Sequence, residues 1–241
     1  MSKNTRKSKY VFRQICEFLN RDAFEWYVAE YNGNRYIKIL SSWQHLLIMI
    51  LGQLWQCRSL RVLVNVLNSQ SSKLYQLGVG LHVSRSTLSD ANNRRDYRIF
   101  EEMANLMIRK AREKRLGYCK DPFLDDKRVF AFDSSTISLC LSIFWWSRLH
   151  HDKGGIKLHT LYEIKTDIPA FVYISDASLH DSKAMLTIAY ESGAYYVFDR
   201  AYMALFNLYA IHQVDAYFVV REKRNMRYKV VEDKYYNNPE S

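Results

Sequence analysis

The spacing of hydrophobic residues changes partway along the chain, near residue 120. Before that point, apolar residues recur every three or four positions, as in Val11, Ile15 and Phe18. This spacing is typical of amphipathic helices, and Ser59 is well placed to cap one of them. We therefore predict that the first half of the chain is all-helical.

Beyond residue 127, the apolar residues form short β-branched and aromatic runs that turns separate. The predicted strands are 129–132, 157–162, 170–174, 194–198 and 216–220, and the predicted helical stretches are 182–192 and 203–213. This order indicates the α/β fold class with a mixed sheet. The predicted domains are a helical one, 1–120, and an α/β one, 121–241, with the boundary near Pro122.

The composition is that of a basic globular protein. The 241 residues are 48% hydrophobic and 25% charged, which excludes a disordered chain, a collagen-like fibre and a disulfide-rich miniprotein. A formal net charge of +10 favours nucleic acid as a partner. The four cysteines form no C-x-x-C pair, so we expect free thiols in a reducing cytosol. The most apolar stretch, 46–51, is too short to cross a membrane.

A polar, basic segment in the helical half has the composition of a helix that contacts DNA. Ser84 or Ser86 is suited to cap this helix, and the helical stretch 59–68 before it would complete a helix-turn-helix-like pair. The side chains suited to phosphate oxygens or base edges are Arg85, Ser86, Thr87, Asn92, Arg94 and Arg95. The alternative is a capped surface helix that contacts only solvent.

Two aspartates each follow an apolar run that is predicted to be a strand. Asp133 follows 129–132, and Asp199 follows 194–198. Carboxylates at strand ends lie where open α/β sheets carry their chemistry, and two of them could share Mg²⁺, which prefers oxygen ligands. The alternative is that each aspartate only begins a turn. The histidines fit no zinc motif, and we expect them to face solvent or phosphate.

Six short motifs follow one another through the second half of the chain. They are Phe132-Asp133-Ser134-Ser135-Thr136, Gly155-Ile156-Lys157-Leu158-His159, Ile168-Pro169-Ala170, His180-Asp181, Phe198-Asp199-Arg200-Ala201-Tyr202 and Phe218-Val219-Val220-Arg221-Glu222-Lys223. In this order they resemble the DDE transposases of bacterial insertion sequences, and more narrowly the family named after insertion sequence number four. The run Ser59-Leu60-Arg61 and the segment 84–92 resemble parts of the helical domain that precedes the catalytic domain in one subgroup. The resemblance covers most of 10–225.

This resemblance implies a ribonuclease-H-like catalytic domain that cleaves DNA and transfers strands. It implies that Asp133 and Asp199 are the first and second acids, which hold Mg²⁺ or Mn²⁺. The residues that it implies to lie near DNA phosphates are Lys157, His159, Arg200, Tyr202 and Arg221. The expected partners are double-stranded DNA, as element ends and target, and a second copy in a homodimer. The expected location is the bacterial cytoplasm, at the nucleoid.

The chain departs from the family pattern at two points. Ala201 stands where the family usually has Gly, and the late string Tyr-x-x-Arg-x-x-x-Glu-x-x-x-x-x-x-Lys that carries the third acid is absent. We therefore expect a C-terminally truncated domain that binds DNA and cleaves it poorly, because two acids hold metal weakly. Two other hypotheses stay open. One is a non-catalytic DNA-binding remnant or regulator, and the other is a different metal-dependent nuclease of similar fold.

Overall fold

The chain forms two compact units, Met1–Lys110 and Ala111–Ser241. The computed structural model describes residues 11–76, 78–79, 82–115, 127–139, 148–150 and 153–223. Helix α7, Arg98–Arg115, begins in the first unit and ends in the second. The predicted boundary near Pro122 lies outside the described residues, so the structure leaves it a prediction.

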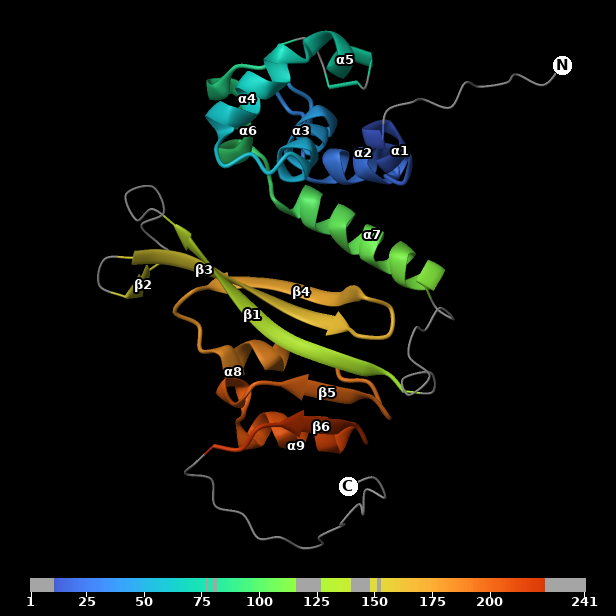
Figure 1. Ribbon diagram of the computed structural model, residues 1–241, viewed down its shortest axis with the longest axis vertical. Helices are drawn as coiled ribbons and strands as arrows, with labels where there is room; N and C mark the ends of the chain where they lie inside the picture. Colours follow the sequence, from blue (N-terminus) through green and yellow to red (C-terminus); the bar gives the residue numbers. More distant parts are fainter. Residues whose placement is uncertain are drawn as a thin grey trace, which may run out of the picture. The chain divides into compact units, whose positions relative to one another are not determined.

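The first unit is helical, as the hydrophobic spacing predicted. Its helices before α7 are α1 (Val11–Glu17), α2 (Arg21–Glu30), α3 (Ser42–Leu54), α4 (Leu60–Ser69), α5 (Ser71–Gln76) and α6 (Arg85–Arg94) (Figure 1). The Ser59 side chain caps α4 by accepting a hydrogen bond from the Val62 backbone N–H at 3.3 Å, which confirms the predicted cap. No helix in the described part of the chain is both long and apolar enough to span a membrane.

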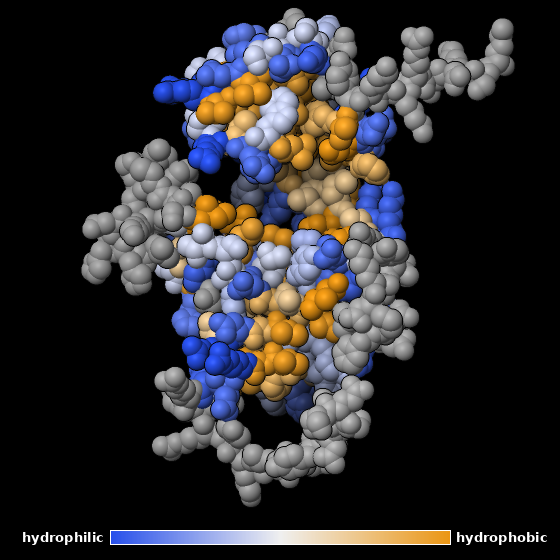
Figure 2. Space-filling model, viewed as in Figure 1, coloured by the Kyte–Doolittle hydropathy of each residue, from blue (hydrophilic) through white to orange (hydrophobic). Residues whose placement is uncertain are grey.

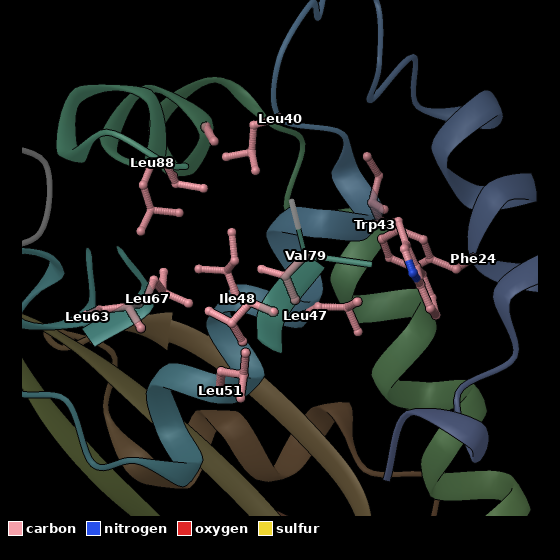
Figure 3. Packing of buried hydrophobic residues seen from close by; sticks show 14 of the residues in the cluster. Phe24, Leu40, Trp43, Leu47, Ile48, Leu51, Leu63, Leu67, Val79 and Leu88 are labelled. Carbon is pink, nitrogen blue, oxygen red and sulfur yellow. The ribbon is translucent and has the colours of Figure 1, made fainter. Parts of the chain in front are cut away.

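One hydrophobic core joins the helices of the first unit. Figure 3 shows Phe24 of α2 packed against Trp43 of α3, with their ring centroids 5.4 Å apart in an edge-on arrangement. Ile48 of α3 and Leu88 of α6 are fully buried in the same cluster. Burying a side chain of this size contributes about 1.5–3 kcal/mol to the free energy of folding, so burial of Leu88 stabilises the position of α6.

Helices α4 and α6 pack together as the predicted pair, but the segment between them is not a short turn. Helix α5 lies within it. Asn68 at the end of α4 ties this segment down, because its side chain donates to the Val83 carbonyl at 3.3 Å and accepts from the Val83 N–H at 3.4 Å. The pair therefore differs from a compact helix-turn-helix, whose turn has only three or four residues.

The second unit contains a mixed sheet with six strands in the described residues. They are β1 (Val129–Leu139), β2 (Arg148–His150), β3 (Lys153–Glu163), β4 (Ile168–Asp176), β5 (Tyr195–Phe198) and β6 (Tyr217–Val220). The order is β2-β3-β1-β5-β6, with β4 also paired to β3 (Figure 1). Strand β1 is antiparallel to β3 and parallel to β5, and β5 is parallel to β6.

Short helices pack on this sheet. They are α8 (Asp181–Ala184), η2 (Met185–Thr187), η3 (Arg200–Tyr202) and α9 (Leu205–Gln213). The prediction of one helix over 182–192 was wrong, since helical structure ends at Thr187. Tyr190 turns back instead: its hydroxyl donates to the Met185 carbonyl at 3.1 Å, and its ring packs edge-on against Tyr196. Met185 and Ile211 bury their side chains in the core beneath the sheet.

The β6 end of the second unit carries exposed hydrophobic residues. Figure 2 shows hydrophobic side chains on the face of this unit in the part of the view where Figure 1 draws β5, β6 and α9. Leu205 and Tyr209 of α9 and Tyr217 and Val219 of β6 are exposed.

Candidate active site

The two predicted carboxylates emerge from neighbouring parallel strands. The last pair in the register of β1 with β5 is Phe132 with Phe198. Asp133, within β1, and Asp199, directly after β5, are the next residues along the chain, so the register brings both to the same edge of the sheet. Both are exposed there. Carboxyl ends of parallel strands are where open α/β sheets bind their ligands.

Asp133 is not at a strand end, which corrects the sequence prediction. Strand β1 continues to Leu139, and Asp133 pairs with Thr160 of β3. The strand continues because β3 runs on beside it, while the shorter β5 stops at Phe198. The loss of this parallel neighbour leaves the Asp133 carboxylate open to solvent, and the antiparallel neighbour keeps its backbone fixed.

One short segment connects the two acids. Asp199 caps helix η3, with its Oδ1 accepting a hydrogen bond from the Arg200 N–H at 2.7 Å. The turn of η3 then directs Tyr202 toward β1, where its hydroxyl is hydrogen-bonded to Ser134 Oγ at 2.8 Å and to Asp133 Oδ1 at 3.3 Å. Asp199 therefore begins the short helix that ends with Tyr202, and the Tyr202 hydroxyl contacts Asp133.

Tyr202 and His159 are buried in this structure, and their predicted contacts with DNA phosphates stay predictions. Tyr202 is 2% exposed, and its ring packs edge-on against Phe132 with centroids 5.1 Å apart. His159 is 0% exposed, its ring stacks on Phe132, and its Nε2 lies 2.8 Å from Ser175 Oγ. Both rings therefore pack against Phe132 of β1.

The other predicted phosphate contacts include two exposed cations. Arg200 directly follows Asp199, and Arg221 directly follows Val220, which pairs with Phe198 across β5 and β6. Both arginines therefore lie along the edge that carries the acids. Lys157 is partly buried, and its Nζ donates to the Leu179 carbonyl at 2.9 Å.

Sequence reasoning missed two residues that build this edge. The Tyr202 hydroxyl is hydrogen-bonded to both Ser134 Oγ and Asp133 Oδ1. Lys223 donates from Nζ to the Met203 carbonyl at 2.8 Å, just after η3. The only sequence signal for Ser134 was its place next to Asp133. Lys223 lies in the motif 218–223, in which Arg221 was the predicted phosphate contact.

The first unit presents a second polar surface at the N-termini of α4 and α6. Ser84 caps α6 by accepting from the Thr87 N–H at 3.1 Å, and its Oγ lies 2.8 Å from Thr87 Oγ1. Arg85 and Ser86 are exposed in the first turn. With Ser59 and other residues of α4 they line a groove of about 670 Å³, which we call the α4/α6 groove.

The remaining candidates on α6 divide between surface and interior. Arg94 is exposed. Asn92 is exposed too, but its Oδ1 lies 2.6 Å from Nε2 of the buried His45. Arg95 is buried, and its Nη2 donates to the Leu40 carbonyl. Arg95, the C-cap residue that follows α6, therefore does not lie on the surface with Arg85 and Arg94.

The donor set at the sheet edge fits a hard divalent cation. Asp133 and Asp199 offer carboxylate oxygens, which Mg²⁺ and Mn²⁺ prefer. Both carboxylates are exposed and neither is consumed by an ion pair in the described part of the chain. Within that part, no three His, Cys, Asp or Glu side chains gather closely enough to form a complete metal site.

Comparison with known proteins agrees with this geometry. Residues 124–239 match the family described as a transposase DDE domain, and residues 7–80 match a domain of unknown function, DUF4372. Over 148 residues the chain is 33% identical to a Sinorhizobium fredii protein named "Putative transposase y4zB", and the match covers 60% of the chain. The chain spans 38% of the length of that relative. The ribonuclease-H-like mixed α/β class is thus confirmed.

Proposed function

We propose, from the match of residues 124–239 to the family described as a transposase DDE domain, that this chain acts in DNA transposition. It binds the ends of an insertion sequence and takes part in metal-dependent cleavage and strand transfer. One observation carries the proposal: the β1–β5 register brings Asp133 and Asp199 to the same edge of the sheet. The narrower assignment, to the family named after insertion sequence number four, is part of the proposal.

The sheet edge divides its tasks among named side chains. Asp133 and Asp199 would hold Mg²⁺ or Mn²⁺, which when bound supplies Lewis-acid activation of the oxygens at a phosphodiester. Tyr202 fixes the orientation of the Asp133 carboxylate through the hydrogen bond at 3.3 Å. Arg200 and Arg221 offset the negative charge of the DNA phosphates that approach the acids.

The α4/α6 groove is the proposed contact with duplex DNA. Two helix N-termini point backbone N–H groups and positive dipole ends toward it, which favours phosphate. Arg61 and Arg85 line the groove, and Ser86 adds a hydroxyl. Arg94, exposed in the last turn of α6, is a proposed DNA contact outside this groove, and Thr87 holds the cap that shapes the first turn of α6. Contacts of this kind position DNA without reading its sequence.

The test uses the full chain and a supercoiled plasmid that carries the element's own ends. With Mn²⁺ or Mg²⁺ we expect slow nicking, because two carboxylates leave the oxygen shell of the metal incomplete. Asp133→Asn should abolish nicking while leaving DNA binding intact. Asp215→Asn, an isosteric change at an exposed turn residue outside the site, is the matched control.

Each alternative gives a different result in the same assay. Duplex binding without any metal-dependent nicking would favour a DNA-binding regulator. Nicking without strand joining would favour a nuclease of similar fold. Nicking that persists in Asp133→Asn would contradict the assignment of the site.

A further inference from the structure

A second cleft in the first unit is not used by the proposed function. It lies between the segment 31–41 and the C-terminal half of α6, and its volume is about 700 Å³. The residues that matter to the argument are Tyr31, Arg35, Tyr36, Lys38, Arg94 and Arg95. We call it the Tyr36 cleft.

A buried cation lies at the base of the Tyr36 cleft. Arg95 is 8% exposed, and its Nη2 donates to the Leu40 carbonyl. Its Nε and Nη1 have no hydrogen-bond partner among the described residues. Burial lowers the pKa of Arg95 to about 10, so the group remains charged at neutral pH. A buried charge that is incompletely paired is unfavourable by itself, and it makes the electrostatic potential of the neighbouring cleft more positive.

The rim adds positive charge that the nearby acids do not cancel. Arg35, Lys38 and Arg94 are exposed around the opening. Two acids also line it, Asp90 and Asp96, but Asp96 is engaged by the Arg98 side chain at 3.0 Å. The cleft therefore has the electrostatics of a site for an anionic ligand.

An aromatic ring is held open at the same rim. Tyr36 is 88% exposed, and the Arg35 guanidinium lies 5.0 Å from its ring centroid. The Tyr36 backbone has φ of +59°, a left-handed conformation that is unfavourable for a residue with a bulky side chain. The Tyr36 ring is exposed, its backbone is strained, and the Arg35 guanidinium lies beside it. This arrangement suits contact with a ligand better than packing in the protein.

The segment that carries Tyr36 is anchored by its neighbours. Gly33 lies so close to the core that an added Cβ would fall 2.4 Å from Ile99 Cδ1. The Ser42 hydroxyl donates to the Gly33 carbonyl at 3.0 Å, and the Ser42 N–H donates to Asn34 Oδ1 at 2.8 Å. These contacts fix the segment before any ligand arrives, which lowers the entropic cost of binding.

We propose that the Tyr36 cleft binds single-stranded DNA, with a base stacked on Tyr36 and a phosphate held by Lys38 and Arg94. Sites for unpaired strands combine basic grooves with aromatic rings in this way. The inference rests on the proposed function and deepens it. It assigns single-stranded DNA as a ligand to the first unit, whose residues 7–80 match DUF4372. Duplex DNA would bind at the α4/α6 groove and an unpaired stretch at the Tyr36 cleft.

The test measures fluorescence anisotropy of a labelled oligothymidylate, and separately of a duplex, with the full chain. Tyr36→Asn is the decisive variant, since asparagine adopts the left-handed conformation more readily than tyrosine. Thermal unfolding should show unchanged or raised stability, whereas affinity for oligothymidylate should fall about tenfold. Duplex affinity should not change. Tyr75→Asn, at an exposed tyrosine of α5, is the matched control.

Further measurements separate the outcomes. Lys38→Ala should weaken oligothymidylate binding by a few fold, and thymidine monophosphate should compete poorly. Unchanged affinity in Tyr36→Asn, an equal loss for duplex, or tighter binding of the mononucleotide than of the oligonucleotide would overturn the inference. If the unaltered chain binds oligothymidylate but no duplex, the duplex contact of the proposed function fails while this site stands.

Discussion

The two units place their polar side chains by different physical means. In the sheet unit, strand register carries Asp133 and Asp199 to one edge, although 66 residues of sequence separate them. In the helical unit, the exposed Arg94 is the last residue of α6, and the next residue, the C-cap Arg95, is buried. Residues that follow strands can therefore be assigned to a site from sequence more securely than neighbouring residues on a helix.

The largest effect should come from the acids that the register aligns. Asp199→Asn keeps a side-chain oxygen that can still cap η3, so the fold should persist. Loss of the carboxylate charge should weaken binding of Mn²⁺ by more than about a hundredfold, since even the supporting partners of metal ligands contribute 10–100-fold. Isothermal titration calorimetry of the full chain with Mn²⁺ measures this directly. Equal Mn²⁺ affinity in Asp199→Asn and in the unaltered chain would separate Asp199 from the site.

The hydrogen bond beneath Asp133 should have the next largest effect. Tyr202→Phe keeps the ring against Phe132 but removes the hydroxyl that holds Asp133 and Ser134. We expect Mn²⁺ affinity to fall about tenfold and the free energy of unfolding to fall by about 1 kcal/mol. Calorimetry and denaturant titration measure the two effects. Tyr209→Phe, at an exposed tyrosine of α9, should change neither, and a loss of stability alone in Tyr202→Phe would leave Tyr202 only a packing role.

These effects depend on contacts that the sequence could not reveal. Periodic apolar residues predicted most of the strands, several helices and the Ser59 cap, because local pattern and local structure coincide there. They did not predict the short α5 and β2 or the end of helical structure at Thr187. The link from Tyr202 to Asp133 spans 69 residues and depends on the turn of η3. No local pattern encodes that turn, so the sequence placed Tyr202 at the surface.

Burial of polar residues was hidden for a related reason. His159 has the sequence neighbourhood of a surface residue, yet β1 and β4 lie on either side of β3 and Phe132 and Tyr173 stack against its ring. The sequence predicts the strand that carries His159 but does not show which residues cover each face of that strand. Only the assembled sheet shows that the His159 side chain is buried.

The helical unit should respond to pH through a buried histidine. His45 donates through Nε2 to Asn92 Oδ1, and burial, with a smaller contribution from the charge of Arg95, lowers its pKa from 6.5 to about 4. Between pH 6.5 and 4 the unfolded chain binds a proton that the folded chain does not. The free energy of unfolding should therefore fall as pH decreases through this window, by on the order of 1 kcal/mol at pH 5.

Urea titrations at pH 7 and pH 5 test this dependence. His45→Gln retains a donor for Asn92 and has no titrating group, so its stability should change less between the two pH values. The same pH dependence in His45→Gln would assign the effect to other groups.

The smallest effect should come from a single arginine on the α4/α6 groove, and it sharpens the contrast between the units. Arg85→Ala removes one exposed charge and leaves the Ser84 cap in place. Duplex affinity should fall only about threefold, and the slope of log affinity against log salt should decrease in magnitude by about 1, as expected for one lost phosphate contact. Anisotropy measurements over a range of salt concentrations give both values. Arg13→Ala, at an exposed arginine of α1 outside the groove, should leave the slope unchanged. If the two variants behave alike, the helical unit attracts DNA by its overall charge, and the groove on α4 and α6 has no special part in binding.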